Sequence, residues 1–62
     1  MNAKDVKRIR AHLKLSQSQF AGFLGISVRT VQEWEQGRHA PGAPATALLK
    51  LVDSGAIPTR RR

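Results

Sequence analysis

Hydrogen-bonding side chains are concentrated in a short segment near the middle of the chain, residues 27–36. Within it, Arg29 carries a planar fork of donors that fits the O6 and N7 acceptors of guanine. Glu33 follows four residues later and could either accept from the N4 amine of cytosine or orient Arg29 through an ion pair. Val28 could pack against a thymine methyl group. The segment therefore predicts base contacts in the DNA major groove from Val28, Arg29 and Glu33.

A second set of residues around this segment suits contacts with phosphate. Helix N-termini attract anions through their free N–H groups and their dipole, and Gln17 is expected to begin a helix. Gln17 has simple capping of that helix as an alternative role, and the two roles are compatible. His39 is a further candidate phosphate donor, but the interpretation as an ordinary loop residue is preferred. The predicted phosphate contacts are Gln17, Ser27, Thr30, Gln32, Gln36 and Arg38.

Two short helices joined by a glycine turn are predicted to position these side chains. Ser16 and Gln19 form a capping box at the start of the first helix, because each side chain can bond the other residue's backbone N–H. Gly25 suits the left-handed conformation in which many helices end, and Ser27 is a suitable N-cap for the second helix. A helix-turn-helix unit is therefore predicted over residues 16–36.

Two further helices are predicted to support this unit, at about residues 3–14 and 45–54. Apolar side chains at helical spacing form the predicted core, whereas Leu49 is expected to point away from it. The fold class is therefore all-α, a compact domain of four to five helices. The expected core residues are Val6, Ile9, Leu13, Phe20, Ala21, Leu24, Ile26, Val31, Trp34, Leu48, Leu51 and Val52.

The pattern of small, glycine and apolar residues over residues 6–52 resembles the phage-repressor type of helix-turn-helix regulators, the Xre/Cro family. A closer likeness is to the DNA-binding part of HigA-type antitoxins. Those proteins carry SxRTxxxWEQGRxxP followed by a helix reading LLKL, where this chain has SVRTVQEWEQGRHAP and then ALLKLV. The residues that match the family are Leu15, Ser16, Gln17, Phe20, Ala21, Leu24, Gly25, Ile26, Ser27, Val31, Trp34, Glu35, Gly37 and Pro41.

The resemblance also implies roles for individual residues. By this resemblance the side chain and the backbone amide of Gln17 face a phosphate. The family pattern implies a partly buried ion pair between Arg10 and Glu35, which would tie the first helix to the third; the alternative is two independent surface charges. Phe23 departs from the pattern, because this position is usually polar in phage repressors. It could meet a partner protein or the last helix, or be an ordinary surface residue. Phage-type recognition helices usually carry glutamines at the base-contact positions, so a different target sequence is expected.

Composition narrows the choice of partner. The 62-residue chain has 11 Lys and Arg against four Asp and Glu, a formal net charge of +7, which suits a polyanion. Charge alone leaves DNA, an anionic membrane and an acidic protein open, and the helix-turn-helix pattern favours DNA. With no cysteine and only two histidines, neither a metal site nor a cofactor is expected. The absence of a signal-peptide pattern and of a membrane-length apolar run predicts a cytoplasmic protein.

Two apolar residues, Leu49 and Ile57, remain outside the predicted core, and such residues are expected in a homodimer contact. The alternative is that they cap the core of one monomer. Two copies would place their recognition helices ~34 Å apart, on adjacent major-groove turns of an inverted repeat. The helix-turn-helix domain is predicted over residues 1–57, and residues 58–62 form a basic tail.

The sequence therefore predicts a DNA-binding transcriptional repressor and no enzyme. The resemblance implies the antitoxin, or its DNA-binding part, of a HigBA-type toxin–antitoxin operon, with its own promoter as operator and a toxin as further partner. A stand-alone or phage-derived Xre-type regulator is the alternative. A protein-interaction module that has lost DNA binding, using Phe23 and Leu49, is the alternative of another class. RNA binding is disfavoured because Trp34 and Phe20 are expected in the core, which leaves no base-stacking platform.

Overall fold

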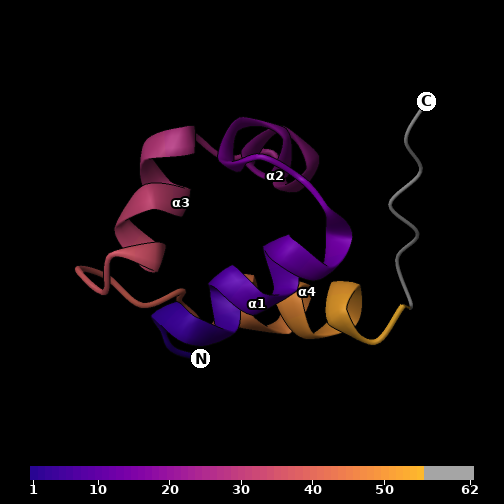
Figure 1. The fold of residues 1–62 in the computed structure, drawn as a ribbon. Helices are drawn as coiled ribbons and strands as arrows, with labels where there is room; N and C mark the ends of the chain where they lie inside the picture. Colours follow the sequence, from indigo (N-terminus) through magenta and orange to yellow (C-terminus); the bar gives the residue numbers. More distant parts are fainter. Residues whose placement is uncertain (56–62) are drawn as a thin grey trace.

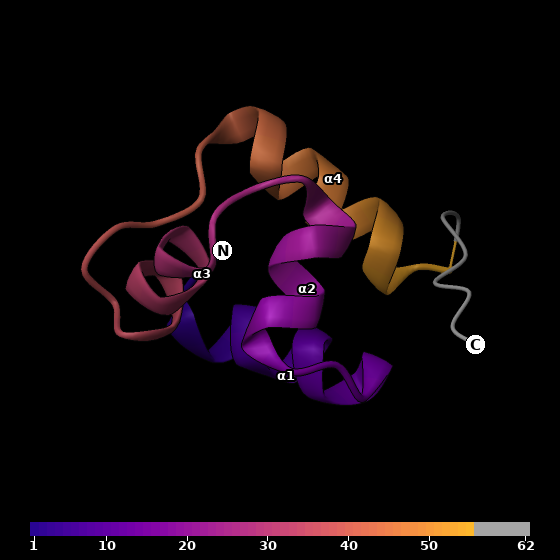
Figure 2. The same cartoon turned by 90° about the horizontal axis from the view of Figure 1, so that it is seen from above.

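The computed structural model describes residues 1–55, and in this part of the chain it contains four helices. They are α1 (Ala3–Leu13), α2 (Gln17–Leu24), α3 (Val28–Glu35) and α4 (Ala43–Asp53). Helix α1 packs against both α3 and α4, and α2 packs against α3 (Figures 1 and 2). The predicted all-α class is confirmed. None of these four helices has the length and hydrophobicity that crossing a membrane would require.

The helix starts follow the capping residues in the sequence. At α2, the Ser16 hydroxyl accepts from the Gln19 backbone N–H at 3.0 Å, and the Gln19 side chain accepts from the Ser16 N–H at 2.9 Å. The Ser27 hydroxyl accepts from the Thr30 N–H at 3.2 Å and begins α3. Asn2 begins α1 with a capping box of the same kind. The predicted N-cap residues are confirmed, because these side chains satisfy N–H groups that have no partner within the helix.

The chain reverses direction after α1, α2 and α3 through a residue in the left-handed conformation. Gly25 (φ 76°) and Gly37 (φ 78°) supply two of these residues without steric cost. The third is Lys14, with φ 60°, the one non-glycine residue of positive φ among residues 1–55. Its backbone N–H donates to the Ala11 carbonyl at 3.0 Å and ends α1 there. The sequence showed no glycine at this turn, so it did not predict the left-handed residue.

The core lies between the helices, and its composition corrects the predictions for Leu49 and Leu51. Leu49 is fully buried, whereas Leu51, expected in the core, is 48% exposed. Both residues fit an apolar stripe of helical spacing, but the stripe that faces the core also includes Ala45, four residues before Leu49. Leu49 therefore cannot form a dimer surface, and Ile57 lies outside the described residues. The buried core residues are Val6, Ile9, Leu15, Phe20, Ala21, Val31, Trp34, Leu49 and Val52.

An ion pair that the sequence did not predict joins the middle of α1 to the last residue of α4. Both terminal nitrogens of Arg8 on α1 donate to the carboxylate of Asp53 on α4, each at 3.3 Å. The pair is exposed to solvent, with 59% of the Arg8 side chain accessible, so it contributes little to stability. Its arrangement keeps the C-terminal end of α4 against α1.

Candidate DNA-binding surface

Helix α3 has one face in the core and one face in solvent. Val31, Trp34 and Glu35 are buried and fix the helix on the rest of the domain. On the opposite side, 37% of Val28 and 82% of the Arg29 side chain are exposed. Figure 1 shows α3 at the outer edge of the molecule, where a ligand can approach it. The structure therefore places the predicted base-contact residues Val28 and Arg29 on the free side of this helix.

The third predicted base-contact residue, Glu33, is held by two neighbours. Its Oε2 accepts from Nε of Arg29 at 3.4 Å, and its Oε1 lies 2.7 Å from Nδ1 of His39. The hydrogen bond from His39, followed by that from Arg29, holds the pKa of Glu33 below its ordinary value of 4.5 despite partial desolvation. The ion pair with Arg29 agrees with the predicted role of Glu33 in orienting that arginine. The contact of Glu33 with cytosine stays a prediction.

The loop after α3 folds back over the last turn of the helix. The N–H of Gly37 donates to the Trp34 carbonyl at 3.2 Å, and the N–H of Arg38 donates to the Glu33 carbonyl at 3.0 Å. This double closure, which the left-handed Gly37 allows, brings Arg38 and His39 beside Glu33. The sequence interpretation missed the role of His39, although the WEQG ending that specifies this turn was visible.

Predicted base-contact and phosphate-contact residues meet in a polar hollow beside α3. The hollow measures about 240 Å³ and opens to solvent. Two arginines lie on its rim, so it is suited to an anionic ligand. Its lining consists of Arg29, Gln32, Glu33, Gln36 and Arg38.

The predicted contact between Arg10 and Glu35 is present. Nε and Nη2 of Arg10 donate to the two carboxylate oxygens of Glu35 at 2.6 and 3.0 Å, and Nη1 donates to the Leu15 carbonyl at 3.0 Å. Burial alone would raise the pKa of Glu35, but the hydrogen bonds from Arg10 and Gln17 and the nearby charges outweigh it and lower that pKa. One buried carboxylate therefore joins α1, the start of α2 and the end of α3.

Gln17 belongs to this same network. Its Nε2 donates to Glu35 Oε1 at 3.1 Å, and its Oε1 accepts from Gln32 Nε2 at 3.5 Å. With the side chain engaged in this way, a phosphate contact at the start of α2 depends on the backbone N–H groups of the helix N-terminus, which attract anions. Ser27 and Thr30, also predicted phosphate contacts, have their hydroxyl groups 3.0 Å apart. Four of the predicted phosphate-contact residues therefore already have hydrogen-bond partners inside the domain.

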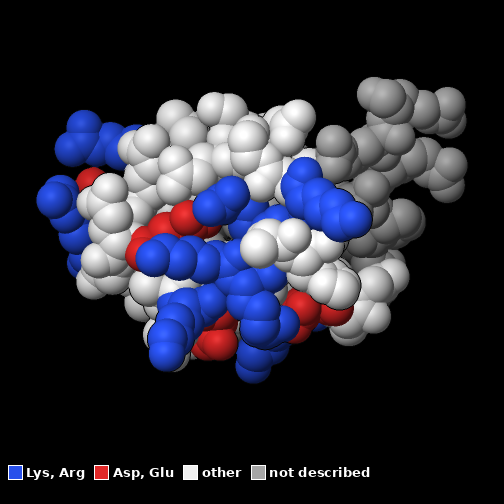
Figure 3. All heavy atoms as spheres, in the orientation of Figure 1, with Lys and Arg blue, Asp and Glu red and all other residues white. Residues whose placement is uncertain are grey.

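The acidic side chains of the domain are all engaged by its own groups. Glu33, Glu35 and Asp53 are in ion pairs, and Asp5 completes the capping box of α1. Lys and Arg side chains gather over α1 and at the outer edge of α3 in Figure 3, with acidic groups between them. Because the negative charges are paired internally, the surface available to a ligand is predominantly positive.

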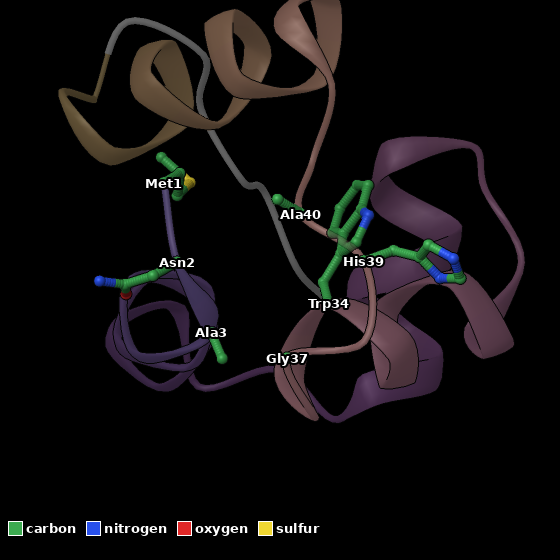
Figure 4. Close-up of a pocket in the computed structure, with 7 residues that line it drawn as sticks. All are labelled: Met1, Asn2, Ala3, Trp34, Gly37, His39 and Ala40. Atoms are coloured by element: carbon green, nitrogen blue, oxygen red, sulfur yellow. The ribbon is translucent and has the colours of Figure 1, made fainter.

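Two further features bear on the surface. A second hollow, of about 200 Å³, lies between the N-terminal residues and the end of α3. Figure 4 shows that the His39 ring, on the rim of this hollow, points away from Met1, Asn2 and Ala3.

On α2, Phe23 is 36% exposed. Among residues 1–55 no group of three or more His, Cys, Asp or Glu side chains could hold a metal ion.

Comparisons with known proteins agree with this architecture. Residues 6–51 match the helix-turn-helix family HTH_3. Over 48 residues, 77% of the chain, the sequence is 44% identical to Antitoxin HigA-2 of Vibrio cholerae serotype O1. The match covers 46% of that protein, so the chain spans about half the length of this curated relative. No solved structure matches the chain.

Proposed function

The chain belongs to the helix-turn-helix family HTH_3, and on this basis we propose that it is a sequence-specific transcriptional repressor that inserts α3 into the major groove of DNA. The observation that carries the proposal is the division of α3 into two faces. Trp34 and Val31 anchor it in the core, while Arg29 projects into solvent. A rigidly held helix with a solvent-exposed arginine is suited to reading a base edge.

Specificity and affinity come from different residues in this proposal. Arg29 donates to guanine, with Val28 and Glu33 contacting neighbouring bases. The residues around the polar hollow and the N-terminus of α2 bind phosphates, which position the domain without reading sequence. Binding to phosphates releases counterions, so affinity falls steeply as salt is raised. The phosphate-binding residues we propose are Gln17, Ser27, Thr30, Gln32, Gln36 and Arg38.

We propose that two copies bind an inverted repeat, because one small module makes few base contacts. Leu49 is buried and cannot contribute to the dimer, whereas Leu51 on α4 is 48% exposed. Leu51→Lys is expected to lower the sedimentation coefficient to that of a monomer and to weaken operator binding. Val28→Lys, at an apolar position on α3 that is 37% exposed, is the control and should leave the oligomeric state unchanged. A Leu51→Lys protein that sediments as wild type would rule out this face.

The name of the relative suggests a narrower role. We propose that the chain is the DNA-binding part of an antitoxin that acts in the bacterial cytoplasm and represses its own toxin–antitoxin operon. The 44% identity to Antitoxin HigA-2 supports this over a stand-alone phage-type regulator. Neutralisation of a toxin is a property proposed for the whole protein. A module that only binds proteins has less support, because Leu49, one of its two proposed contact residues, is buried.

The test is selection of DNA duplexes from a random pool at near-physiological salt, followed by affinity measurements on the recovered duplex. The wild type is expected to recover one inverted repeat, found beside its own gene. Arg29→Ala should bind that duplex about 10- to 150-fold more weakly and relax one position of the site. Arg38→Ala is the control, since it should weaken all duplexes equally. Weak, uniform binding that Arg29→Ala leaves unchanged would contradict the proposal.

A further inference from the structure

Glu33 presents an electrostatic problem for a surface that binds a polyanion. It lies on α3 between Arg29 and the loop that follows the helix, and it lines the polar hollow with Arg38. A carboxylate at this place repels phosphate unless a positive charge neutralises it. Arg29 is a poor permanent counter-charge, because its contact with Glu33 is 3.4 Å long and its side chain is 82% exposed. It is also the residue proposed to leave Glu33 for guanine.

His39 makes the shorter contact with Glu33 and is held in place to do so. Its Nδ1 lies 2.7 Å from Glu33 Oε1, and its backbone N–H points at the Glu33 carbonyl at 3.5 Å. Because an ionised carboxylate can only accept, this geometry requires the proton of the neutral ring to be on Nδ1. The other nitrogen, Nε2, then carries a lone pair, and 72% of the side chain is open to solvent.

We propose that DNA binding by this chain is coupled to protonation of His39 at Nε2. The proton comes from solvent and converts the ring to an imidazolium, which neutralises Glu33 while Nδ1–H stays bonded to it. The new Nε2–H becomes a donor for a DNA phosphate. Binding therefore takes up a proton, and affinity rises as the pH falls through the range in which histidines change charge. This inference rests on the proposed DNA binding. It adds His39 to the residues that contact phosphate and makes DNA affinity depend on pH.

The charged groups around the ring act in two directions, because the Glu33 carboxylate favours the imidazolium and the positive groups nearby oppose it. Glu33 faces Nδ1 and remains ionised throughout the relevant range, because its pKa lies below the ordinary 4.5. Arg29 on α3 and Arg38 in the loop are permanently positive and oppose the imidazolium until DNA phosphate offsets their charge. Among the residues that line the second hollow with His39, Met1 carries a further titratable group, its amino group. The ring points away from that N-terminal segment (Figure 4). DNA phosphate is therefore the added charge that favours the imidazolium.

The experiment measures affinity for the duplex recovered by selection, and for a mixed-sequence duplex, between pH 6 and pH 8. The wild type is expected to bind about tenfold more tightly at pH 6, the effect of one pKa unit of coupling. His39→Gln, which keeps a hydrogen-bond donor but cannot charge, should bind at the weak pH 8 level throughout. The chain has one other histidine, His12, which is exposed on α1. His12→Gln is therefore the matched control and should retain the wild-type pH dependence.

Proton uptake provides a second measurement that does not depend on any substitution. Calorimetric titration in buffers of different ionisation heat should show uptake of a fraction of a proton, up to about one per protomer. A pH dependence that persists in His39→Gln, or no proton uptake by the wild type, would overturn the inference while leaving DNA binding intact. If no duplex binds at pH 6 or pH 8, the proposed function itself has failed, and this inference with it.

Discussion

Two arginine–glutamate pairs in this domain share the same chemistry in opposite surroundings. Arg10 and Glu35 meet at 2.6 Å, with 24% and 3% of their side chains exposed. Arg29 and Glu33 meet at 3.4 Å, with 82% and 25% exposed. In the first pair, Arg10 also donates to the Leu15 carbonyl and Glu35 also accepts from Gln17. In the second pair, the Glu33 carboxylate also contacts the ring of His39.

The difference shows how one kind of pair can serve the fold or a ligand. A desolvated pair is costly to break, because the remaining charge has no water to replace its partner. Arg10 and Glu35 therefore hold α1, α2 and α3 in a fixed relation. An exposed pair exchanges its partner for water at little cost. Arg29 is therefore free to leave Glu33 for a base, which is the behaviour that the proposed DNA contact requires.

The largest expected effect is that of Glu35→Ala. It leaves Arg10 without its carboxylate and should lower the free energy of unfolding by about 3–5 kcal/mol, most of the stability of a domain this small. Urea unfolding followed by circular dichroism measures the loss. Glu35→Gln keeps an oxygen acceptor and should lose less. A loss below about 1 kcal/mol for Glu35→Ala would group this pair with surface pairs.

Acidification tests the same carboxylate without mutation. The pKa of Glu35 is lower in the folded state than its ordinary 4.5, so its contribution to stability is complete above pH 4.5 and is lost as the pH falls through the folded-state pKa. Unfolding midpoints of the wild type should therefore decline below about pH 4.5. Glu35→Gln, which cannot titrate, should decline less steeply over that range. Equal slopes for the two proteins would show that other groups dominate acid unfolding.

A smaller effect is expected at the turn that supports Arg10. The left-handed Lys14 (φ 60°) places the Leu15 carbonyl where Arg10 Nη1 bonds it. Lys14→Gly removes the strain of a side chain in this conformation and should stabilise the protein by about 0.5–1 kcal/mol. Lys4→Gly, inside α1, is the control and should destabilise it by a similar amount. A destabilised Lys14→Gly protein would mean that the lysine side chain contributes more than its backbone costs.

The features that could be predicted from the sequence are those that depend on residues close together in the chain. Ser16, Gln19 and Gly25 specify a helix start and end within ten positions, and the helix-turn-helix follows from them. The prediction for Leu49 and Leu51 was wrong, since both lie on apolar stripes and only the packing of α4 against α1 decides which is buried. A similar argument explains Arg8 and Asp53, whose contact depends on the complete fold.

The site divides in the same way. The pairing of Arg10 with Glu35 came from the family pattern, and the i, i+4 spacing of Arg29 and Glu33 indicated their contact. The position of His39 depends on two backbone hydrogen bonds that close the loop over Glu33, and no spacing rule covers a side chain beyond a helix end. The contacts of a side chain in that position can be predicted only once the loop conformation is known.

The smallest expected effect distinguishes the exposed pair from the buried one most directly. In a double-mutant cycle of Arg29→Ala and Glu33→Ala, the coupling measured by urea unfolding should be indistinguishable from zero, because solvent replaces each partner. The same cycle on Arg10 and Glu35 should give a coupling well above error. For DNA binding, the exposed pair should matter more than the buried pair among variants that fold. Arg29→Ala should reduce DNA affinity, although its unfolding midpoint should match that of the wild type. A large stability coupling between Arg29 and Glu33 would make that pair structural, and Arg29 would then not be free to contact DNA.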